Sequence, residues 1–111
     1  MEQDLLKNIK TLLKSADLVY NTGDYTSATI LYFKAAFAIL DLIILRATGN
    51  SPKDHSERFR ILQKSFPDLY DFIDKYFKIY RDTYSITISR SVCDEFKKNV
   101  RQIIERYKIP L

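Results

Sequence analysis

The chain contains one histidine, His55, and this is the side chain best suited to acid–base or anion chemistry near neutral pH. Two cationic residues, Lys53 and Arg58, lie within three positions of it. We place His55 in the first turn of a helix, where free backbone N–H groups can hold a phosphate. Lys53, His55 and Arg58 therefore predict an anion-binding site. The alternative is that His55 only packs or forms hydrogen bonds at a helix junction.

Metal and cysteine chemistry have little support in the sequence. One histidine and one cysteine provide no cluster of metal ligands, so we expect no metal and no cofactor. The single cysteine, Cys93, cannot form an internal disulfide and is interpreted as a small core residue. The N-terminus also lacks the basic and apolar regions of a signal peptide. We therefore expect a cytoplasmic protein.

Asp41 is the least ordinary acidic residue, because it lies within an apolar run over residues 28–45. A buried carboxylate needs a partner, and Lys34, Arg81 or a symmetry-related chain could provide it. The alternative places Asp41 at the edge of the apolar face. The run is long enough to span a membrane, but Lys34 and Asp41 would each cost roughly 2.5 to 3.5 kcal/mol at the bilayer centre. We expect no membrane interaction.

Two further groups of side chains have both a functional and a structural interpretation. The formal net charge is +4, and all of the excess lies after residue 52, which suits an anionic partner or a solvated surface equally. The last helix has a basic side that can contact phosphates or an acidic partner, or be simply solvated. A set of tyrosines can stack on bases, although such a stripe is usually core. The cations are Lys97, Lys98, Arg101, Arg106 and Lys108, and the tyrosines are Tyr70, Tyr76, Tyr80 and Tyr84.

The elements that would position these residues are helices. With 111 residues, two glycines and three prolines, the chain favours one domain over residues 1–111 built from a few long helices. We expect Gly23 and Asp24 to separate the first two helices, Ser51 and Ser91 to cap later ones, and Ser65 to precede another. The apolar stripe of the fourth helix should reach Tyr84. The fold class is an all-α, up-and-down bundle of about five helices, four long and one short, over about residues 3–20, 24–48, 52–65, 67–84 and 91–107.

The second of these helices lacks a polar face of ordinary width, so it must be covered on nearly all sides. Three amphipathic partners from a short chain do not easily supply that cover. We therefore predict a homodimer that forms through the second helix. The alternative is a monomer in which this helix is fully buried.

Several motifs share their order and spacing with a known family. They are Gly23-Asp24-Tyr25 with Ser27-Ala28, the segment from Tyr32 to Phe37, Gly49 with the turn from Pro52 to Ser56, and Arg81-Asp82-Thr83-Tyr84. Together they resemble the HEPN family of small all-α nucleotide-binding domains. The resemblance implies a HEPN-like bundle, commonly a homodimer and often encoded beside a minimal nucleotidyltransferase in a two-component, toxin–antitoxin type of module.

Some HEPN proteins are metal-independent ribonucleases that use an arginine followed, four to six residues later, by a histidine. In such a site, histidine takes the proton of an RNA 2′-hydroxyl and arginine holds the charge that develops on phosphate. Here the arginine nearest before His55 is Arg46, nine positions away. We therefore expect a non-catalytic module that binds nucleotide, nucleic acid or a nucleotidyltransferase through a basic surface. The alternative is a ribonuclease with a non-standard site, for which His55, Arg58 and Arg81 are the candidate catalytic residues.

Overall fold

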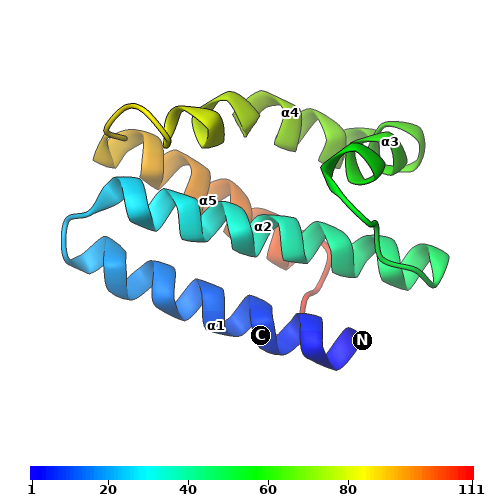
Figure 1. Ribbon diagram of the computed structural model, residues 1–111. Helices are drawn as coiled ribbons and strands as arrows, with labels where there is room; N and C mark the ends of the chain where they lie inside the picture. The colour runs from blue at the N-terminus through cyan, green and yellow to red at the C-terminus, as the bar shows by residue number, and fades with distance from the viewer.

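The computed structural model describes residues 1–111 and contains five α-helices and no strands (Figure 1). This confirms the all-α class and the pattern of four long helices and one short helix. The helices are α1 (Glu2–Asn21), α2 (Tyr25–Thr48), α3 (His55–Ser65), α4 (Pro67–Asp82) and α5 (Arg90–Arg106).

A tight turn makes α1 and α2 an antiparallel hairpin, as predicted. Gly23 has a φ of 86°, which glycine adopts without steric cost. The Asp24 side chain then caps α2 by accepting a hydrogen bond of 3.0 Å from the backbone N–H of Ser27. Gly49, with a φ of 85°, ends α2 in the left-handed conformation.

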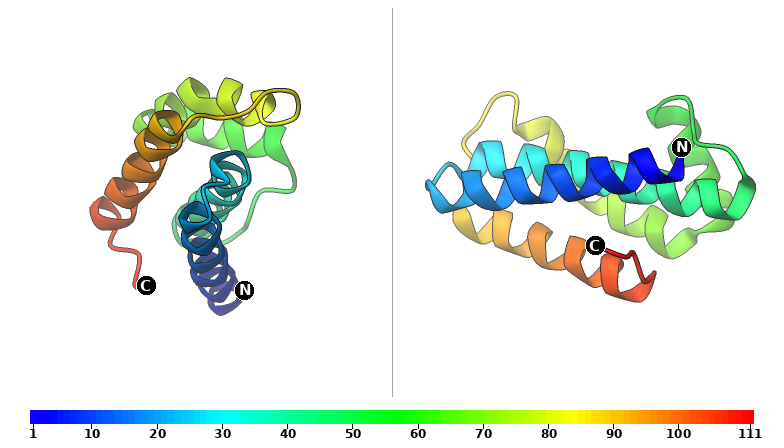
Figure 2. Two further views of the ribbon diagram at one scale, coloured as in Figure 1. Left: turned by 90° about the vertical axis from the view of Figure 1, so that its left-hand side faces the viewer. Right: turned by 90° about the horizontal axis from the view of Figure 1, so that it is seen from below.

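Helix α2 is the centre of the bundle, with α1, α4 and α5 arranged around it (Figures 1 and 2). Thirteen of its 24 residues are buried within this one chain. Phe33 on α2 and Phe96 on α5 stack with their ring centroids 3.8 Å apart, and Cys93 is buried as predicted. Since the other helices already cover most of α2, its cover does not require a second chain, and the homodimer stays a prediction.

The start of α3 differs from the prediction. The helix begins at His55 rather than near residue 52, and Asp54 rather than Ser51 is its N-cap. The Asp54 carboxylate accepts a hydrogen bond of 2.9 Å from the N–H of Glu57. Residues 51–54 therefore lie before the helix, with Asp54 in an extended conformation. The physical reason is that two capping residues compete here, and the later one starts the helix one turn before its first buried residue, Arg58.

The ends of α4 and α5 also differ slightly from the predicted ranges. Phe66 precedes α4 without a side-chain cap, although Pro67 occupies the first turn as expected. Tyr84 lies beyond the end of α4 and is 80% exposed, so its predicted place in the core stripe is wrong. Ser89 rather than Ser91 caps α5 by accepting a hydrogen bond from Val92.

By length and composition, α2 is the single helix that could cross a membrane. Within its most apolar 18-residue segment, 72% is buried inside the bundle. Core helices and signal sequences also pass this criterion. Location in the cell stays a prediction.

Candidate functional site

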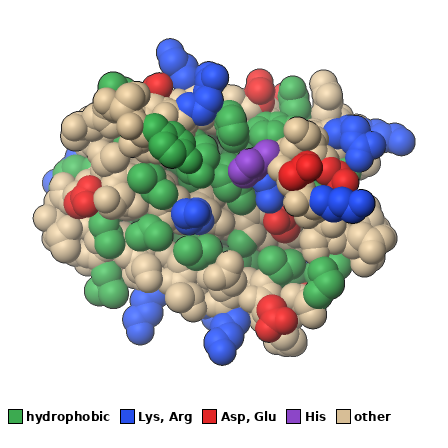
Figure 3. Space-filling view, viewed as in Figure 1, with side chains coloured by type: hydrophobic (Ala, Val, Ile, Leu, Met, Phe, Trp, Pro, Cys, Tyr) green, Lys and Arg blue, Asp and Glu red, His purple; other side chains and the backbone are tan.

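A cleft of about 370 Å³ runs along the face of α2 that α1, α3 and α4 leave partly uncovered. We call it the α2 groove. Hydrophobic side chains gather across this face, and the single histidine lies beside them (Figure 3). The lining residues come from four helices and are Leu5, Asn8, Leu12, Lys34, Phe37, Ala38, Asp41, His55 and Tyr80.

Asp41, which the apolar run leaves in need of a partner, finds it in Arg58 of α3. Arg58 donates from Nε to Asp41 Oδ1 at 2.6 Å and from Nη2 to Oδ2 at 3.0 Å. Both side chains are largely buried, at 10% and 17% exposure for Arg58 and Asp41. The predictions of Lys34, Arg81 or a second chain as partner were wrong, because α3 packs against α2 and places Arg58 within hydrogen-bond reach of Asp41.

Arg58 also contacts the only histidine. Its Nη1 lies 2.5 Å from Nδ1 of His55, one turn earlier on α3. A guanidinium can only donate hydrogen bonds, so Nδ1 must accept and the imidazole must be neutral with its proton on Nε2. Burial of the ring, followed by the positive charge of Arg58, lowers the pKa of His55 below its ordinary value. Since His55 lines the groove, we expect its Nε2–H to be available there as a hydrogen-bond donor.

Aromatic rings pack against this arrangement. The His55 ring lies edge-on to Phe37, with centroids 4.8 Å apart, and Phe77 lies on a further side at 6.1 Å. The Arg58 guanidinium carbon is 5.0 Å from the centre of the Phe37 ring. The guanidinium is buried and fixed by Asp41, whereas the exposed imidazole contacts these rings with part of its surface.

Lys34 is the one lysine or arginine that lines the groove. It is exposed, lies two turns before Asp41 on α2, and makes no ion pair within the chain. The groove continues past Lys34 and Tyr80 into a hollow of about 120 Å³ that is also lined by Ile30, Thr83 and Tyr84. Because Arg58 compensates the charge of Asp41, the ammonium of Lys34 is the uncompensated charge of this surface.

Of the predicted site residues, the structure brings together His55 and Arg58. Lys53 is exposed before α3 begins, and neither Lys53 nor Arg81 lines the groove or pairs with His55. Lys34 takes their place as the nearby cation, although it was not among the predicted site residues. The signal for it was present, since Lys34 is the one basic residue in the apolar run.

The basic side of α5 is partly neutralised by acidic residues of other helices. Arg101 and Lys97 both lie near Asp17 of α1, with N–O distances of 3.0 and 3.9 Å. Arg106 forms an ion pair of 3.2 Å with Asp68 of α4. Three of the five predicted cations on this surface are therefore engaged within the chain.

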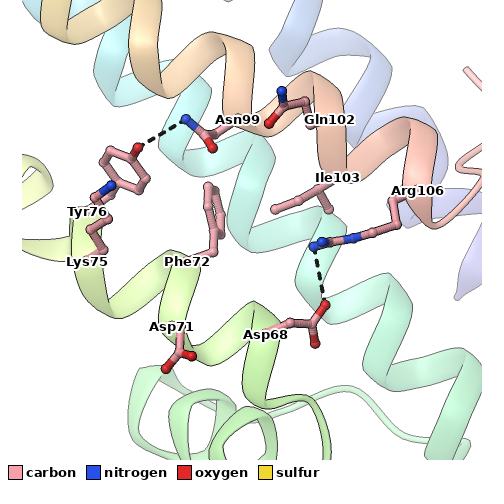
Figure 4. Close-up of a pocket in the computed structure, with 9 residues that line it drawn as sticks. All are labelled: Asp68, Asp71, Phe72, Lys75, Tyr76, Asn99, Gln102, Ile103 and Arg106. Carbon is pink, nitrogen blue, oxygen red and sulfur yellow. Dashed lines mark hydrogen bonds and ion pairs between the residues drawn. The ribbon is translucent and has the colours of Figure 1, made fainter.

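A second cleft, of about 270 Å³, lies between α4 and α5 (Figure 4). Some of its polar side chains bind one another. Besides the ion pair of Arg106, Asn99 donates to the Tyr76 hydroxyl at 3.0 Å, and the Lys75 ammonium lies 5.2 Å from the centre of the Tyr76 ring. The charged residues that line this cleft, two acidic and two basic, sum to zero, so it lacks the uncompensated positive charge of the α2 groove.

No family model matches the chain, and no curated protein or solved structure is similar enough to count as a match. The side chains also form no group of three or more His, Cys, Asp or Glu residues that could hold a metal ion. The geometry of the α2 groove is therefore the main guide to function.

Proposed function

We propose that this chain is a non-catalytic, HEPN-like binding module whose α2 groove takes an anionic ligand of the nucleotide or nucleic acid class. The observation that supports it is the combination, on one cleft, of the free Lys34 ammonium and the His55 imidazole, with Asp41 neutralised by Arg58. The HEPN-like assignment rests on the order of the motifs and is consistent with the five-helix bundle.

The chemistry of the groove suits a ligand with one charged and one apolar part. An ammonium and an imidazole N–H both donate to phosphate oxygens. The apolar wall, formed by Leu5, Leu12 and Phe37, can pack against a base or a ribose. A volume of about 370 Å³ lies in the range of clefts that hold small molecules, roughly 300 to 1,000 Å³.

The state of His55 supports binding rather than catalysis. A general base needs a free lone pair, but Nδ1 accepts from Arg58 and Nε2 carries the proton. Arg58, the candidate for stabilising charge on a phosphate, is held by Asp41. The ribonuclease alternative is tested by incubating the protein with single-stranded RNA beside a His55→Ala control. Cleavage that is lost in the control would overturn the non-catalytic assignment.

Binding is tested by calorimetric titration with adenosine monophosphate, inorganic phosphate and a short single-stranded RNA. We expect Lys34→Gln to weaken binding of at least one of these probes by about tenfold, because one charge-assisted contact is lost. Lys98→Gln is the matched control, since Lys98 is an exposed lysine on α5 outside the groove. Failure of all three probes to bind at millimolar concentration, or equal loss in both variants, would refute the proposal.

Self-association and a nucleotidyltransferase partner are further parts of the proposal that rest on the family resemblance. Tyr84, which lines the hollow, and Ile86 are 80% and 56% exposed and offer apolar surface for a second chain. Light scattering over a range of concentrations tests the homodimer, and a constant mass of one chain would refute it. A gene for a small nucleotidyltransferase next to this one would support that partner.

A further inference from the structure

Arg58 joins three side chains into one hydrogen-bonded unit. Its Nε and Nη2 donate to the two carboxylate oxygens of Asp41, and its Nη1 donates to Nδ1 of His55. Two parallel hydrogen bonds to one carboxylate fix the plane of the guanidinium, and therefore the direction of its third donor. The orientation of Arg58 is thus set by α2, although Arg58 belongs to α3.

We propose that Arg58 is a positioning residue that fixes His55 as a hydrogen-bond donor at the α2 groove. The groove then selects ligands by acceptor atoms, such as phosphate or carboxylate oxygens, in addition to overall charge. This inference rests on the proposed function, because it specifies which ligand atoms the same site recognises.

The argument starts from the two nitrogens of the imidazole ring. An isolated neutral histidine can carry its proton on either nitrogen, so either can donate or accept. Arg58 occupies Nδ1 with a donor that cannot become an acceptor, which leaves Nε2 as the ring nitrogen free for a ligand. The Phe37 ring lies edge-on to the imidazole, at 4.8 Å between centroids, and contacts it on the side of α2.

Burial and the surrounding charges act on the protonation of His55 in two opposing directions. Burial and the guanidinium of Arg58 favour the neutral imidazole, whereas the carboxylates of Asp41 and Asp54 favour the protonated form. Lys34 shares the groove with His55 and adds positive charge. Asp41 is engaged by Arg58, and Asp54 is engaged in capping α3. The neutral donor form is therefore favoured at neutral pH.

Because the chain has one histidine, long-range ¹H–¹⁵N NMR reports its protonation state and tautomer without assignment problems. In the wild-type protein, we expect the Nε2–H tautomer between about pH 7 and 8. In Arg58→Met, we expect a mixture of tautomers and a higher pKa for His55. Arg60→Gln is the matched control, because Arg60 is on the same helix and its side chain is 74% exposed.

Two outcomes would overturn the role of Arg58: the Nδ1–H tautomer in the wild-type protein, or an unchanged tautomer and pKa in a folded Arg58→Met variant. If Arg58→Met does not fold, Arg58→Lys can be used instead. It keeps the positive charge but loses the two parallel hydrogen bonds to Asp41, so His55 should again populate both tautomers. Addition of inorganic phosphate separates this inference from the proposed function. A fixed Nε2–H tautomer with no response to phosphate, adenosine monophosphate or RNA would refute the ligand and its acceptor selectivity, but not the fixing of His55.

Discussion

Arg58 of α3 and Asp41 of α2 face each other through two parallel hydrogen bonds of 2.6 and 3.0 Å. The pair lies 17 residues apart in the chain and fixes the short helix α3 against the central helix. It also decides the chemistry of the surface, because it removes the negative charge of Asp41 and holds the imidazole of His55. The pair therefore contributes both to the packing of α3 and to the proposed binding site.

Removing one member of the pair should destabilise the protein strongly. We expect Arg58→Met to lower the free energy of unfolding by roughly 3 kcal/mol, because Asp41 is left as a largely buried, uncompensated charge. The double variant Asp41→Leu/Arg58→Met should lose much less than the sum of the single variants. Chemical denaturation gives the values, and additive losses would contradict this account of the pair.

The start of α3 can be tested with two matched substitutions. Asp54→Ala should cost about 1 kcal/mol, because the N–H of Glu57 loses its side-chain acceptor. Ser51→Ala should change the free energy of unfolding by less than about 0.5 kcal/mol. Thermal or chemical denaturation compares the two, and the reverse ranking would restore the start predicted from the sequence.

The stacked rings of Phe33 and Phe96 join α2 to α5 at the centre of the core, where both side chains are fully buried. We expect Phe33→Ala to cost about 3 to 5 kcal/mol, because it removes a large apolar side chain and leaves a cavity. Tyr84→Ala, at an 80% exposed position, is the control and should have little effect. Similar losses in both variants would contradict the place of Phe33 in the buried core.

The lowered pKa of His55 predicts how stability changes with pH. The folded protein binds its proton less readily than the unfolded chain, so this contribution to stability is present above the ordinary histidine pKa of about 6.5. This contribution should be lost as the pH falls through the lowered pKa that His55 has in the folded protein. His55→Gln should lack this component in denaturation experiments from pH 7.5 to 5. An identical pH dependence in both proteins would contradict the neutral state of His55.

Most of the fold could be predicted from the sequence, because apolar spacing identifies helices and Gly23 with Asp24 marks the first turn. The site was predicted only in part. His55 and Arg58 were recognised because they are neighbours in the chain. The pairing of Arg58 with Asp41 depends on where α3 begins and how it crosses α2, which local capping signals did not fix, since Ser51 and Asp54 are both good caps. Lys34 was visible as the one basic residue of the apolar run, but only tertiary packing places it in the same groove as His55.

The most direct test of the central claim is to locate the bound ligand by backbone amide NMR during a titration with adenosine monophosphate. Our account predicts saturable shifts at residues that line the α2 groove, including Lys34, His55 and Tyr80, and their loss in Lys34→Gln. Shifts confined to the basic side of α5, or no shifts at millimolar concentration, would contradict it.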